Sequence, residues 1–337
     1  MMRILLFAIF ILAIIAVGIY AYKVRSVQTE TTSDFSNVVA EKPLDKYTIE
    51  NLSKQTFEKS KIEIGRMIGE NEDFASYIFY FYPQGLKVSG LLNAPKGGGE
   101  FSTVVMFRGY VDREDYLTGV GTQRAGEMFA RNNFVTLAPD FLGYGESDNP
   151  SSDVMEERFQ TYITALTLLS SLGNLNNELA TKNIEARASR DKVGIWGHSN
   201  GGQIALTILE ASGKLYPTVL WAPVSKPFPY SVLYYTDDFD DHGKLLRKKI
   251  ADFEKDYDVE KYSLTNYFEK INAKIQIYQG TADDAVPVRW SNELVEKLQK
   301  LNKDVEYFTY QGNDHNFAQG AWQAVVERNI LFYRENL

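Results

Sequence analysis

Residues 193–202 read Val-Gly-Ile-Trp-Gly-His-Ser-Asn-Gly-Gly, and this stretch decides the fold. Its apolar start runs into Gly-x-Ser-x-Gly, and the next residues, 203–209, are typical of a buried helix. A strand, a serine and a helix in this order form a nucleophile elbow, a tight turn that presents the serine hydroxyl above a sheet. Gly197 and Gly201 leave room for the backbones that pass close to such a turn. We therefore expect Ser199 to be a nucleophile, provided that the chain also supplies a base and an acid.

The base must come from the three histidines of the chain, because a serine hydroxyl is activated by an adjacent base that a third group orients. His198 directly precedes the serine, so its side chain points away from the position of a base, and we expect it to pack beside the elbow. His242 lies in an acidic, polar stretch. His315 lies in a loop after the apolar run 305–310, where a base at the carboxyl edge of a sheet belongs. We predict that His315 is the base.

The acid is expected between the serine and the histidine, since the chain order in this architecture is serine, acid, histidine. Residues 275–280 are typical of a strand, and the following loop, 281–287, contains two adjacent aspartates. On this reasoning either Asp283 or Asp284 orients the histidine.

With these pieces the chain resembles the prolyl oligopeptidase-like α/β-hydrolases, with dienelactone-hydrolase-type esterases next in similarity. The resemblance covers roughly residues 75–337 and rests on the segments 141–147, 197–202, 280–287 and 312–315. In that group the acid is the aspartate three residues after the glycine and three before the valine, which implies Asp283 rather than Asp284. A triad of this kind implies a serine hydrolase that needs no cofactor and no metal.

The resemblance also implies an oxyanion hole, in which two backbone N–H groups face the negative charge that develops on the substrate oxygen. One donor is expected from Asn200, the residue after the nucleophile. The other is expected after the strand 102–107, and we assign it to Tyr110. Many relatives carry His-Gly where this chain has Arg108 and Gly109, so we expect Arg108 either to pair with a carboxylate or to orient this loop.

Apolar runs alternate with helical segments along most of the chain, which predicts an α/β fold with a mainly parallel central sheet and helices on both faces. The expected strands and helices are strands 102–107, 134–138, 193–196, 218–221, 275–279 and 305–310, and helices 155–172, 292–301 and 322–334. Before them we expect a helical stretch at 49–66 and a hairpin of strands 77–82 and 86–92.

About fifty residues separate the strands 218–221 and 275–279, far more than a typical connection. We expect residues 224–272 to be a small cap insertion over the active site, because long loops in such positions control access and specificity. Its aromatic residues either line the substrate site or fix the cap to the domain: Phe228, Tyr230, Tyr234 and Tyr235. Its acidic cluster at 237–241 is expected to be a solvated loop, with calcium binding as the alternative.

The amino-terminal residues 4–22 form an uncharged run that follows Arg3 and precedes Lys23 and Arg25. Such a run is long enough to span a membrane as a helix, and longer than the apolar core of a usual cleaved signal. The expected domains are a transmembrane anchor or signal segment at 1–25, a flexible linker at 26–45 and the catalytic domain at 46–337. We expect the catalytic domain outside the cytoplasm, and secreted if the segment is cleaved.

A net charge of −8 argues against general nucleic-acid binding, which depends on basic surface. The chain has no cysteine, and its three histidines are far apart, so no metal-ligand spacing is present in the sequence. The expected partners are a small ester or peptide substrate and, through the amino terminus, a membrane.

The hypothesis is a serine hydrolase that cleaves an ester or a short-peptide amide through an acyl-enzyme on Ser199. One alternative is a carboxylesterase without peptidase activity, acting on small esters or acylated polysaccharides. The second alternative is a non-catalytic, membrane-tethered binding protein on a hydrolase fold.

Overall fold

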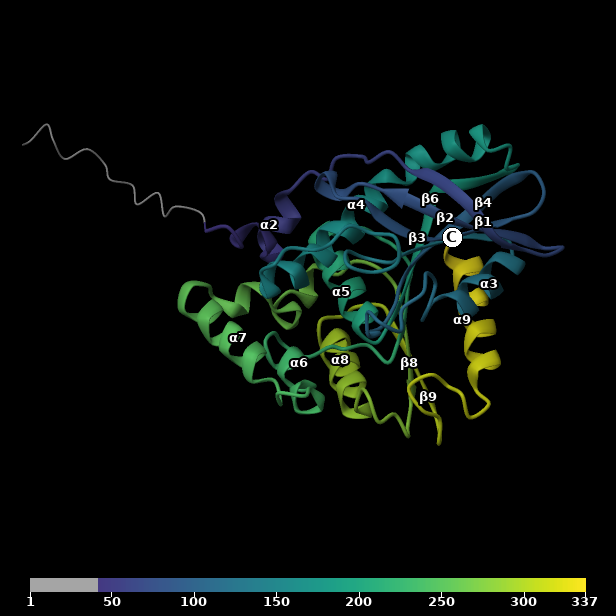
Figure 1. The fold of residues 1–337 in the computed structure, drawn as a ribbon. Helices are drawn as coiled ribbons and strands as arrows, with labels where there is room; N and C mark the ends of the chain where they lie inside the picture. The colour runs from purple at the N-terminus through teal and green to yellow at the C-terminus, as the bar shows by residue number, and fades with distance from the viewer. Residues whose placement is uncertain (1–41) are drawn as a thin grey trace, which may run out of the picture. The chain divides into compact units, whose positions relative to one another are not determined.

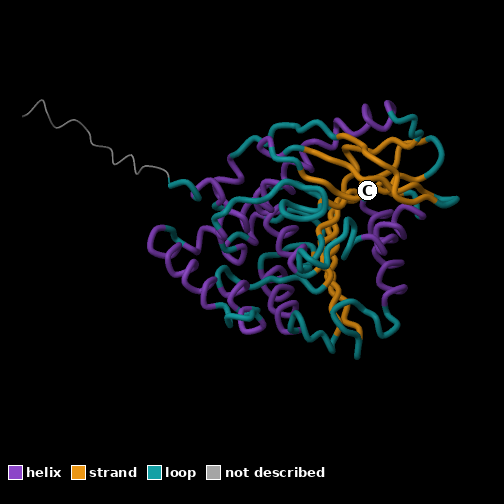
Figure 2. The backbone as a smooth tube through the Cα atoms, viewed as in Figure 1, coloured by secondary structure: helices purple, strands orange, loops and turns teal. Residues whose placement is uncertain are grey.

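The computed structural model describes residues 42–337, of which Leu44–Leu337 form one compact unit. A single nine-stranded sheet runs through this unit, in the order β1-β2-β3-β5-β4-β6-β7-β8-β9 (Figures 1 and 2). The strands are β1 (Glu63–Glu70), β2 (Phe74–Phe81), β3 (Val88–Pro95), β4 (Gly99–Phe107), β5 (Phe134–Pro139), β6 (Ala186–His198), β7 (Thr218–Trp221), β8 (Ile275–Gly280) and β9 (Val305–Tyr310).

From β5 to β9 the neighbouring strands of the sheet are all parallel, whereas β1, β2 and β3 pair antiparallel and β3 pairs antiparallel with β5. The expected mainly parallel α/β sheet is therefore confirmed. The expected hairpin is confirmed as well, and its two strands, β2 and β3, are joined by a short 3-10 turn at Pro83–Gly85.

Successive side chains of a strand belong alternately to two separate apolar clusters, one on each face of the sheet. In β4, Val105 and Phe107 belong to one cluster, while Val104 and Met106 belong to the other. This alternation follows from the period of two along a strand. The helices are α2 (Ile49–Lys54), α3 (Gln123–Arg131), α4 (Val154–Thr181), α5 (Asn200–Ser212), α6 (Tyr230–Leu233), α7 (Lys244–Asp256), α8 (Val288–Lys300) and α9 (Trp322–Asn336).

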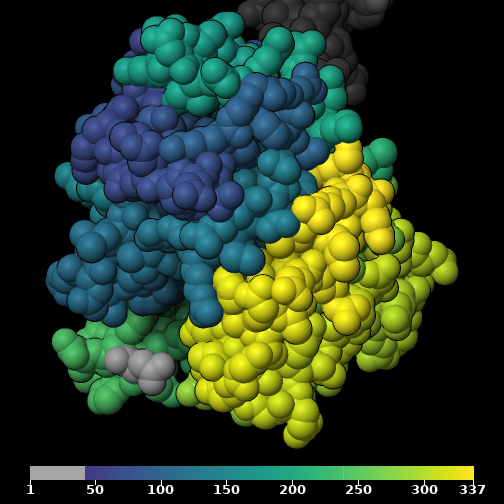
Figure 3. Space-filling model, turned by 90° about the vertical axis from the view of Figure 1, so that its right-hand side faces the viewer, coloured from purple at the N-terminus to yellow at the C-terminus, as the bar shows by residue number. Residues whose placement is uncertain are grey.

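The first cluster lies under α4, α5 and α8, and the second lies under α3 and α9. In Figure 1 the two groups of helices stand on opposite sides of the sheet. Figure 3 shows the side that carries α9, where the yellow carboxyl-terminal segment adjoins the blue surface of the first half of the chain. Helices on both faces are therefore confirmed, although α4 is longer than predicted and ends only at Thr181.

The predicted helix at 49–66 is wrong in its second half. The helix α2 ends at Lys54, and residues 63–70 form the edge strand β1, which pairs with β2. Ile62 and Ile64 are both buried, at a spacing of two residues, which is the period of a strand. The misassignment arises because the partner of this segment, β2, supplies backbone hydrogen bonds that no local pattern reveals.

The insertion between β7 and β8 contains α6, α7 and several 3-10 turns. Phe228 contacts Phe159 of α4 at a ring-centroid distance of 5.6 Å, and Phe253 and Tyr262 pack on the same pair. Phe228 thus fixes the insertion to α4. Tyr234 instead contacts Trp290 of α8 at 4.8 Å, on the side of the loop that carries Asp283.

Two members of the acidic cluster have structural contacts. Asp241 accepts the Gly243 and Leu245 backbone N–H groups at the start of α7, and Asp237 forms an ion pair with Arg247. Within residues 42–337 no group of three or more His, Cys, Asp or Glu side chains is placed to hold a metal ion.

The predicted anchor and most of the predicted linker lie outside the described residues. Among the helices from residue 42 onward, none has both the length and the apolar character that a membrane crossing requires.

Candidate active site

Ser199 occupies a strained turn between β6 and α5, with φ 56° and ψ −118°. A strained conformation of this kind costs about 1–3 kcal/mol and persists only where its surroundings hold it. Here the Ser199 N–H donates to the Trp221 carbonyl at 2.9 Å, and the Ser199 carbonyl accepts the Val224 N–H at 3.0 Å. The turn is therefore fixed from both sides by the chain at the end of β7.

The glycines of the motif are required by close backbone contacts. A Cβ added to Gly201 would lie 1.9 Å from the Phe107 carbonyl oxygen, and one added to Gly197 would lie 2.6 Å from the Gly201 carbonyl oxygen. Gly202 has a similar constraint, since its Cβ would lie 2.6 Å from Pro223. Any larger residue would push α5 away from β4 and displace the serine.

Asp283 and His315 meet at the carboxyl edge of the sheet. His315 Nδ1 lies 2.8 Å from Asp283 Oδ2, and the Asp283 side chain has no exposed surface, whereas 14% of the His315 side chain is exposed. An ionised carboxylate can only accept, so Nδ1 carries the proton of the neutral ring and Nε2 is left free as a base. Asp284, the other sequence candidate, is exposed and does not contact His315.

The Asp283 carboxylate is held by three further donors. Oδ1 accepts the backbone N–H groups of Ala285 and Val286 at 2.9 and 2.8 Å, and Oδ2 accepts Gln279 Nε2 at 2.8 Å. The Gln279 amide is itself fixed, since its oxygen accepts the Ser291 hydroxyl at 2.7 Å. This network orients the carboxylate toward the histidine and compensates its burial.

The Ser199 hydroxyl makes no hydrogen bond to His315 in the described part of the chain. Such contacts often form only when substrate is bound. The two loops are instead joined by His198, whose Nε2 lies 3.0 Å from the His315 carbonyl oxygen and whose ring centroid is 4.5 Å from that of His315.

Burial and the neighbouring His315 lower the pKa of His198 to about 3, so its imidazole is neutral. Because a carbonyl oxygen can only accept, Nε2 of His198 carries the proton. Sequence reasoning assigned His198 to packing beside the elbow, and the structure gives it this contact with the loop of the candidate base. In the sequence, the available indication of this contact was the position of His198 directly before Ser199.

The loop after β4 passes directly beside the nucleophile. A Cβ added to Gly109 would lie 3.1 Å from Ser199 Cβ, so the backbone of this loop is in contact with the serine. Tyr110 follows, and Asn200 is the first residue of α5, whose leading N–H groups have no acceptor within the helix. The Tyr110 side chain points to solvent, where its hydroxyl donates to Asp112, which raises the pKa of Tyr110 to about 12.

Arg108 orients this loop, and within residues 42–337 it does not form an ion pair with a carboxylate. Its guanidinium donates to the Gly109 carbonyl at 2.9 Å and to the Asp140 carbonyl at 3.0 Å. It also lies over the rings of Tyr144 and Tyr116, at 4.0 and 4.5 Å from their centroids. The buried guanidinium is thus held by backbone and aromatic groups beside the loop that contacts the serine.

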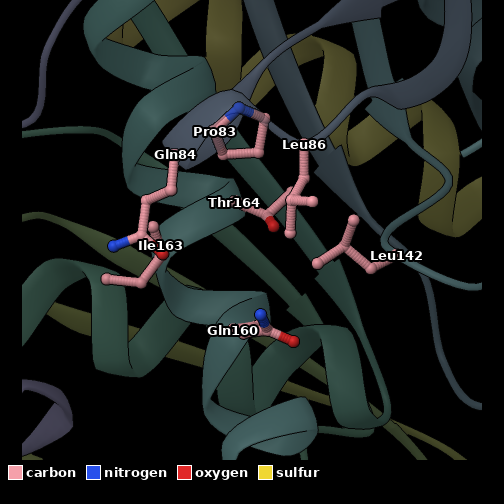
Figure 4. A pocket seen from close by; sticks show the side chains of 7 residues that line it. All are labelled: Pro83, Gln84, Leu86, Leu142, Gln160, Ile163 and Thr164. Atoms are coloured by element: carbon pink, nitrogen blue, oxygen red, sulfur yellow. The ribbon is translucent and has the colours of Figure 1, made fainter. Parts of the chain in front are cut away.

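The hollows of the described surface include a cleft and a small pocket. A cleft of about 490 Å³ lies between residues 119–127 and the start of α9, and His198, Trp196 and Trp221 line it. A much smaller pocket of about 10 Å³ lies between the turn at Pro83 and α4, and it is large enough for roughly one water molecule (Figure 4). None of the candidate catalytic residues lines this smaller pocket.

Comparison with known proteins gives matches to both peptidases and esterases. Residues 178–337 match the Prolyl oligopeptidase family. A protein described as an uncharacterized peptidase, YtmA of Bacillus subtilis (strain 168), is 26% identical over 262 residues, which cover 76% of this chain and 92% of the relative.

Solved structures with the same fold include acetyl xylan esterase 1 from a Thermoanaerobacterium species, with a TM-score of 0.56, 16% identity, and coverage of 86% of this chain and 93% of the other. The Pyrococcus furiosus esterase Pf2001 has a TM-score of 0.51 and 16% identity, over 82% of this chain and 97% of the other. A puromycin-hydrolyzing peptidase of Mycobacterium tuberculosis has a TM-score of 0.54 and 17% identity, over 82% of this chain but 39% of the other. At these identities the likeness establishes a shared fold and no shared substrate.

Proposed function

We propose that the protein is a serine hydrolase that cleaves an ester or a short-peptide amide through an acyl-enzyme on Ser199. The match of residues 178–337 to the Prolyl oligopeptidase family and the α/β-hydrolase fold support this proposal. The observation that supports the proposal most strongly is the Asp283–His315 hydrogen bond of 2.8 Å beside a serine on a strained elbow. A buried acid, an oriented imidazole and a half-buried turn serine have this arrangement in acyl-transfer sites.

In the proposed reaction His315 Nε2 takes the hydroxyl proton as Ser199 Oγ attacks the substrate carbonyl. Asp283 holds the imidazolium that forms, and the Asn200 and Tyr110 N–H groups bind the oxyanion. His315 then gives the proton to the leaving group, the carbonyl re-forms and the acyl group stays on Ser199. A water molecule, deprotonated by His315, releases the acid product in the same way.

The proposal is tested with the full chain, wild type and Ser199→Ala, on p-nitrophenyl acyl esters and on aminoacyl and prolyl p-nitroanilides. We expect Ser199→Ala to lower kcat by about 10⁴- to 10⁶-fold, because removing a triad serine leaves only binding and oxyanion stabilisation. The melting temperature should be unchanged, since alanine has the same backbone restriction at this turn. Retained turnover in Ser199→Ala would overturn the mechanism.

The same panel separates the two hydrolase candidates. Ester cleavage without anilide cleavage identifies a carboxylesterase, a possibility that two of the structural neighbours favour by their names. Serine-dependent anilide cleavage identifies a peptidase, in agreement with the family match. If a serine-directed phosphonate leaves the wild-type protein unlabelled, the non-catalytic binding protein becomes the better description.

We also propose that residues 4–22 anchor the protein in a membrane, with the catalytic domain outside the cytoplasm. The uncharged run between Arg3 and Lys23 supports this proposal. Fractionation of cells that express the full chain should find it with the membranes after carbonate washing. Leu12→Arg with Ile15→Arg should release it, because each arginine at the centre of such a helix costs about 3 kcal/mol. Equal extraction of both proteins would exclude the anchor.

A further inference from the structure

Arg158, on α4, is a partly buried cation with no counter-ion among the described residues. Its Nη2 donates to Gln203 Oε1 at 3.0 Å, and its Nε is buried without a hydrogen-bond partner. Among residues 42–337 no carboxylate lies within ion-pair distance of it. The neighbouring acids are already paired, Glu156 with Lys46 and Glu157 with Arg113.

Such an arrangement is costly unless a further group completes it. Burial lowers the pKa of the Arg158 guanidinium, yet an arginine in a protein remains charged. Charged groups are rarely buried unless they are paired, because desolvation costs several kcal/mol per ion. Arg108, the other buried arginine beside the serine, contrasts with it, since Arg108 is bound by two carbonyl oxygens and by aromatic rings.

Arg158 lies close to the nucleophile. Gln203, its partner, belongs to the first turn of α5, and the Gln203 N–H points at the Ser199 carbonyl at 3.4 Å. Phe159, the next residue on α4, contacts Phe228 of the insertion, which places Arg158 near the junction of α4, α5 and the insertion.

We propose that Arg158 binds a carboxylate of the substrate, so that the preferred substrates are acidic esters or short acidic peptides. This inference rests on the proposed hydrolase function and adds the substrate class to it. A guanidinium presents a fork of N–H donors that matches a carboxylate, and pairing would compensate the buried charge.

The insertion and helix α8 carry further buried donors without partners that suit an oxygen-rich ligand. The hydroxyls of Ser231 and Tyr235 and the indole N–H of Trp290 are buried without partners. Burial, with the nearby Tyr234 and Asp283, raises the pKa of Tyr235, so its hydroxyl stays protonated and able to donate. These groups and Arg158 all offer hydrogens and no negative charge.

The test compares matched acidic and neutral esters with the full-length protein. On the acyl side, mono-p-nitrophenyl suberate is paired with p-nitrophenyl octanoate. On the leaving-group side, 3-(4-acetoxyphenyl)propanoate is paired with its amide. We expect the wild type to prefer the acid in one of the two pairs, and that pair tells which part of the substrate meets Arg158.

In Arg158→Gln we expect kcat/KM for the preferred acid to fall about 10- to 100-fold, the range for one lost hydrogen-bonded charge contact. The matched neutral ester should change less than about threefold, and Arg158→Lys should keep part of the preference, because it keeps the charge without the fork. Arg113→Gln is the control, because the charge of Arg113 is already compensated by an ion pair with Glu157, which lies on the same helix as Arg158.

Equal rates for acid and neutral esters in both pairs would overturn the carboxylate proposal while leaving the hydrolase proposal intact. An equal loss on acid and neutral substrates in Arg158→Gln would also overturn it, because that result indicates a purely structural arginine. Failure of the hydrolase proposal is seen separately, as turnover that survives Ser199→Ala.

Discussion

Two regions near Ser199 differ in how fully their buried polar groups are paired. The first, called the oxyanion side, is the loop after β4 that carries the proposed oxyanion donor Tyr110. The second, called the insertion side, is the insertion together with the neighbouring helices α4 and α8. On the oxyanion side, the buried Asp140 carboxylate accepts the hydroxyls of Ser89, Tyr116 and Thr118, and Arg108 binds two backbone carbonyls. Only Nε of Arg108 is left over there.

On the insertion side, Arg158, Ser231, Tyr235 and Trp290 each keep a buried polar atom without a partner. Saturated networks hold a backbone in one geometry, which an oxyanion loop needs. Unpaired donors are expensive in the free protein and gain most from a ligand. This contrast supports the two proposals, in which the first region holds the reaction geometry and the second recognises the substrate.

After Ser199→Ala, the largest expected effect concerns the acid. Asp283→Asn should lower kcat by about 10⁴-fold, because an amide stabilises the wrong tautomer of the histidine. Asp284→Asn, the adjacent and exposed residue, should leave kcat within about twofold of wild type. Steady-state kinetics on one ester decides between them. A stronger loss in Asp284→Asn would show that the neighbouring aspartate is the acid.

On the oxyanion side, Arg108→Met should lower both the free energy of unfolding and kcat. Two hydrogen bonds to carbonyls disappear, so the free energy of unfolding should fall by about 2–4 kcal/mol. The loop that carries Tyr110 is released, so kcat should fall about 10- to 100-fold, with KM little changed. Denaturant unfolding and kinetics measure the two effects, and wild-type stability in this variant would contradict the structural role.

Glu210 tests whether a buried group without a hydrogen-bond partner also destabilises the protein when it lies far from Ser199. It lies on α5, both of its carboxyl oxygens are buried without partners, and burial raises its pKa well above the ordinary value. A raised folded pKa means that stability is lost as pH rises above the unfolded value of 4.5.

Glu210→Gln should therefore raise the free energy of unfolding by about 1–3 kcal/mol at pH 8 and by little at pH 4. Activity should be unchanged, because Glu210 does not contact the candidate site. Thermal unfolding across pH measures this difference. A loss of activity would assign Glu210 a role in the site.

His198 is expected to act as a positioning residue for His315. His198→Phe keeps a ring beside His315 and removes the hydrogen bond to its carbonyl oxygen, which is worth about 1 kcal/mol. We expect kcat to fall about tenfold, KM to stay constant and the melting temperature to change little. His198→Gln, which can still donate, should recover part of the rate. An unchanged kcat in His198→Phe would exclude the positioning role.

The smallest effect on stability is expected at Tyr235. Tyr235→Phe removes a buried hydroxyl that has no partner, so the free energy of unfolding should change by less than about 0.5 kcal/mol. On the paired side, Ser89→Ala should cost about 1–3 kcal/mol, because it leaves the Asp140 carboxylate short of a donor. Equal losses in the two variants would remove the contrast between the two regions.

The secondary structure close to the site could be predicted from sequence, and the amino-terminal part less well. The strands β7 and β9 have the predicted bounds, since each is a short apolar run. The stretch 49–66 was misassigned because its second half is stabilised by pairing with β2 rather than by its own pattern. The roles proposed for Ser199, Asp283 and His315 remain predictions until their variants are measured.

Sequence alone determined the elbow, because its requirements are local: a strand, a strained serine and small residues at fixed spacing. It also determined the alternating pattern that specifies a parallel sheet with helices on both faces. The resemblance to a family already implied Asp283 as the acid, and the tertiary structure shows its contact with His315. Only the tertiary structure decided what Arg108 binds and that Arg158 has no counter-ion among residues 42–337. Each of these depends on groups that are far apart in the chain, and their positions follow from how the sheet, the helices and the insertion pack together.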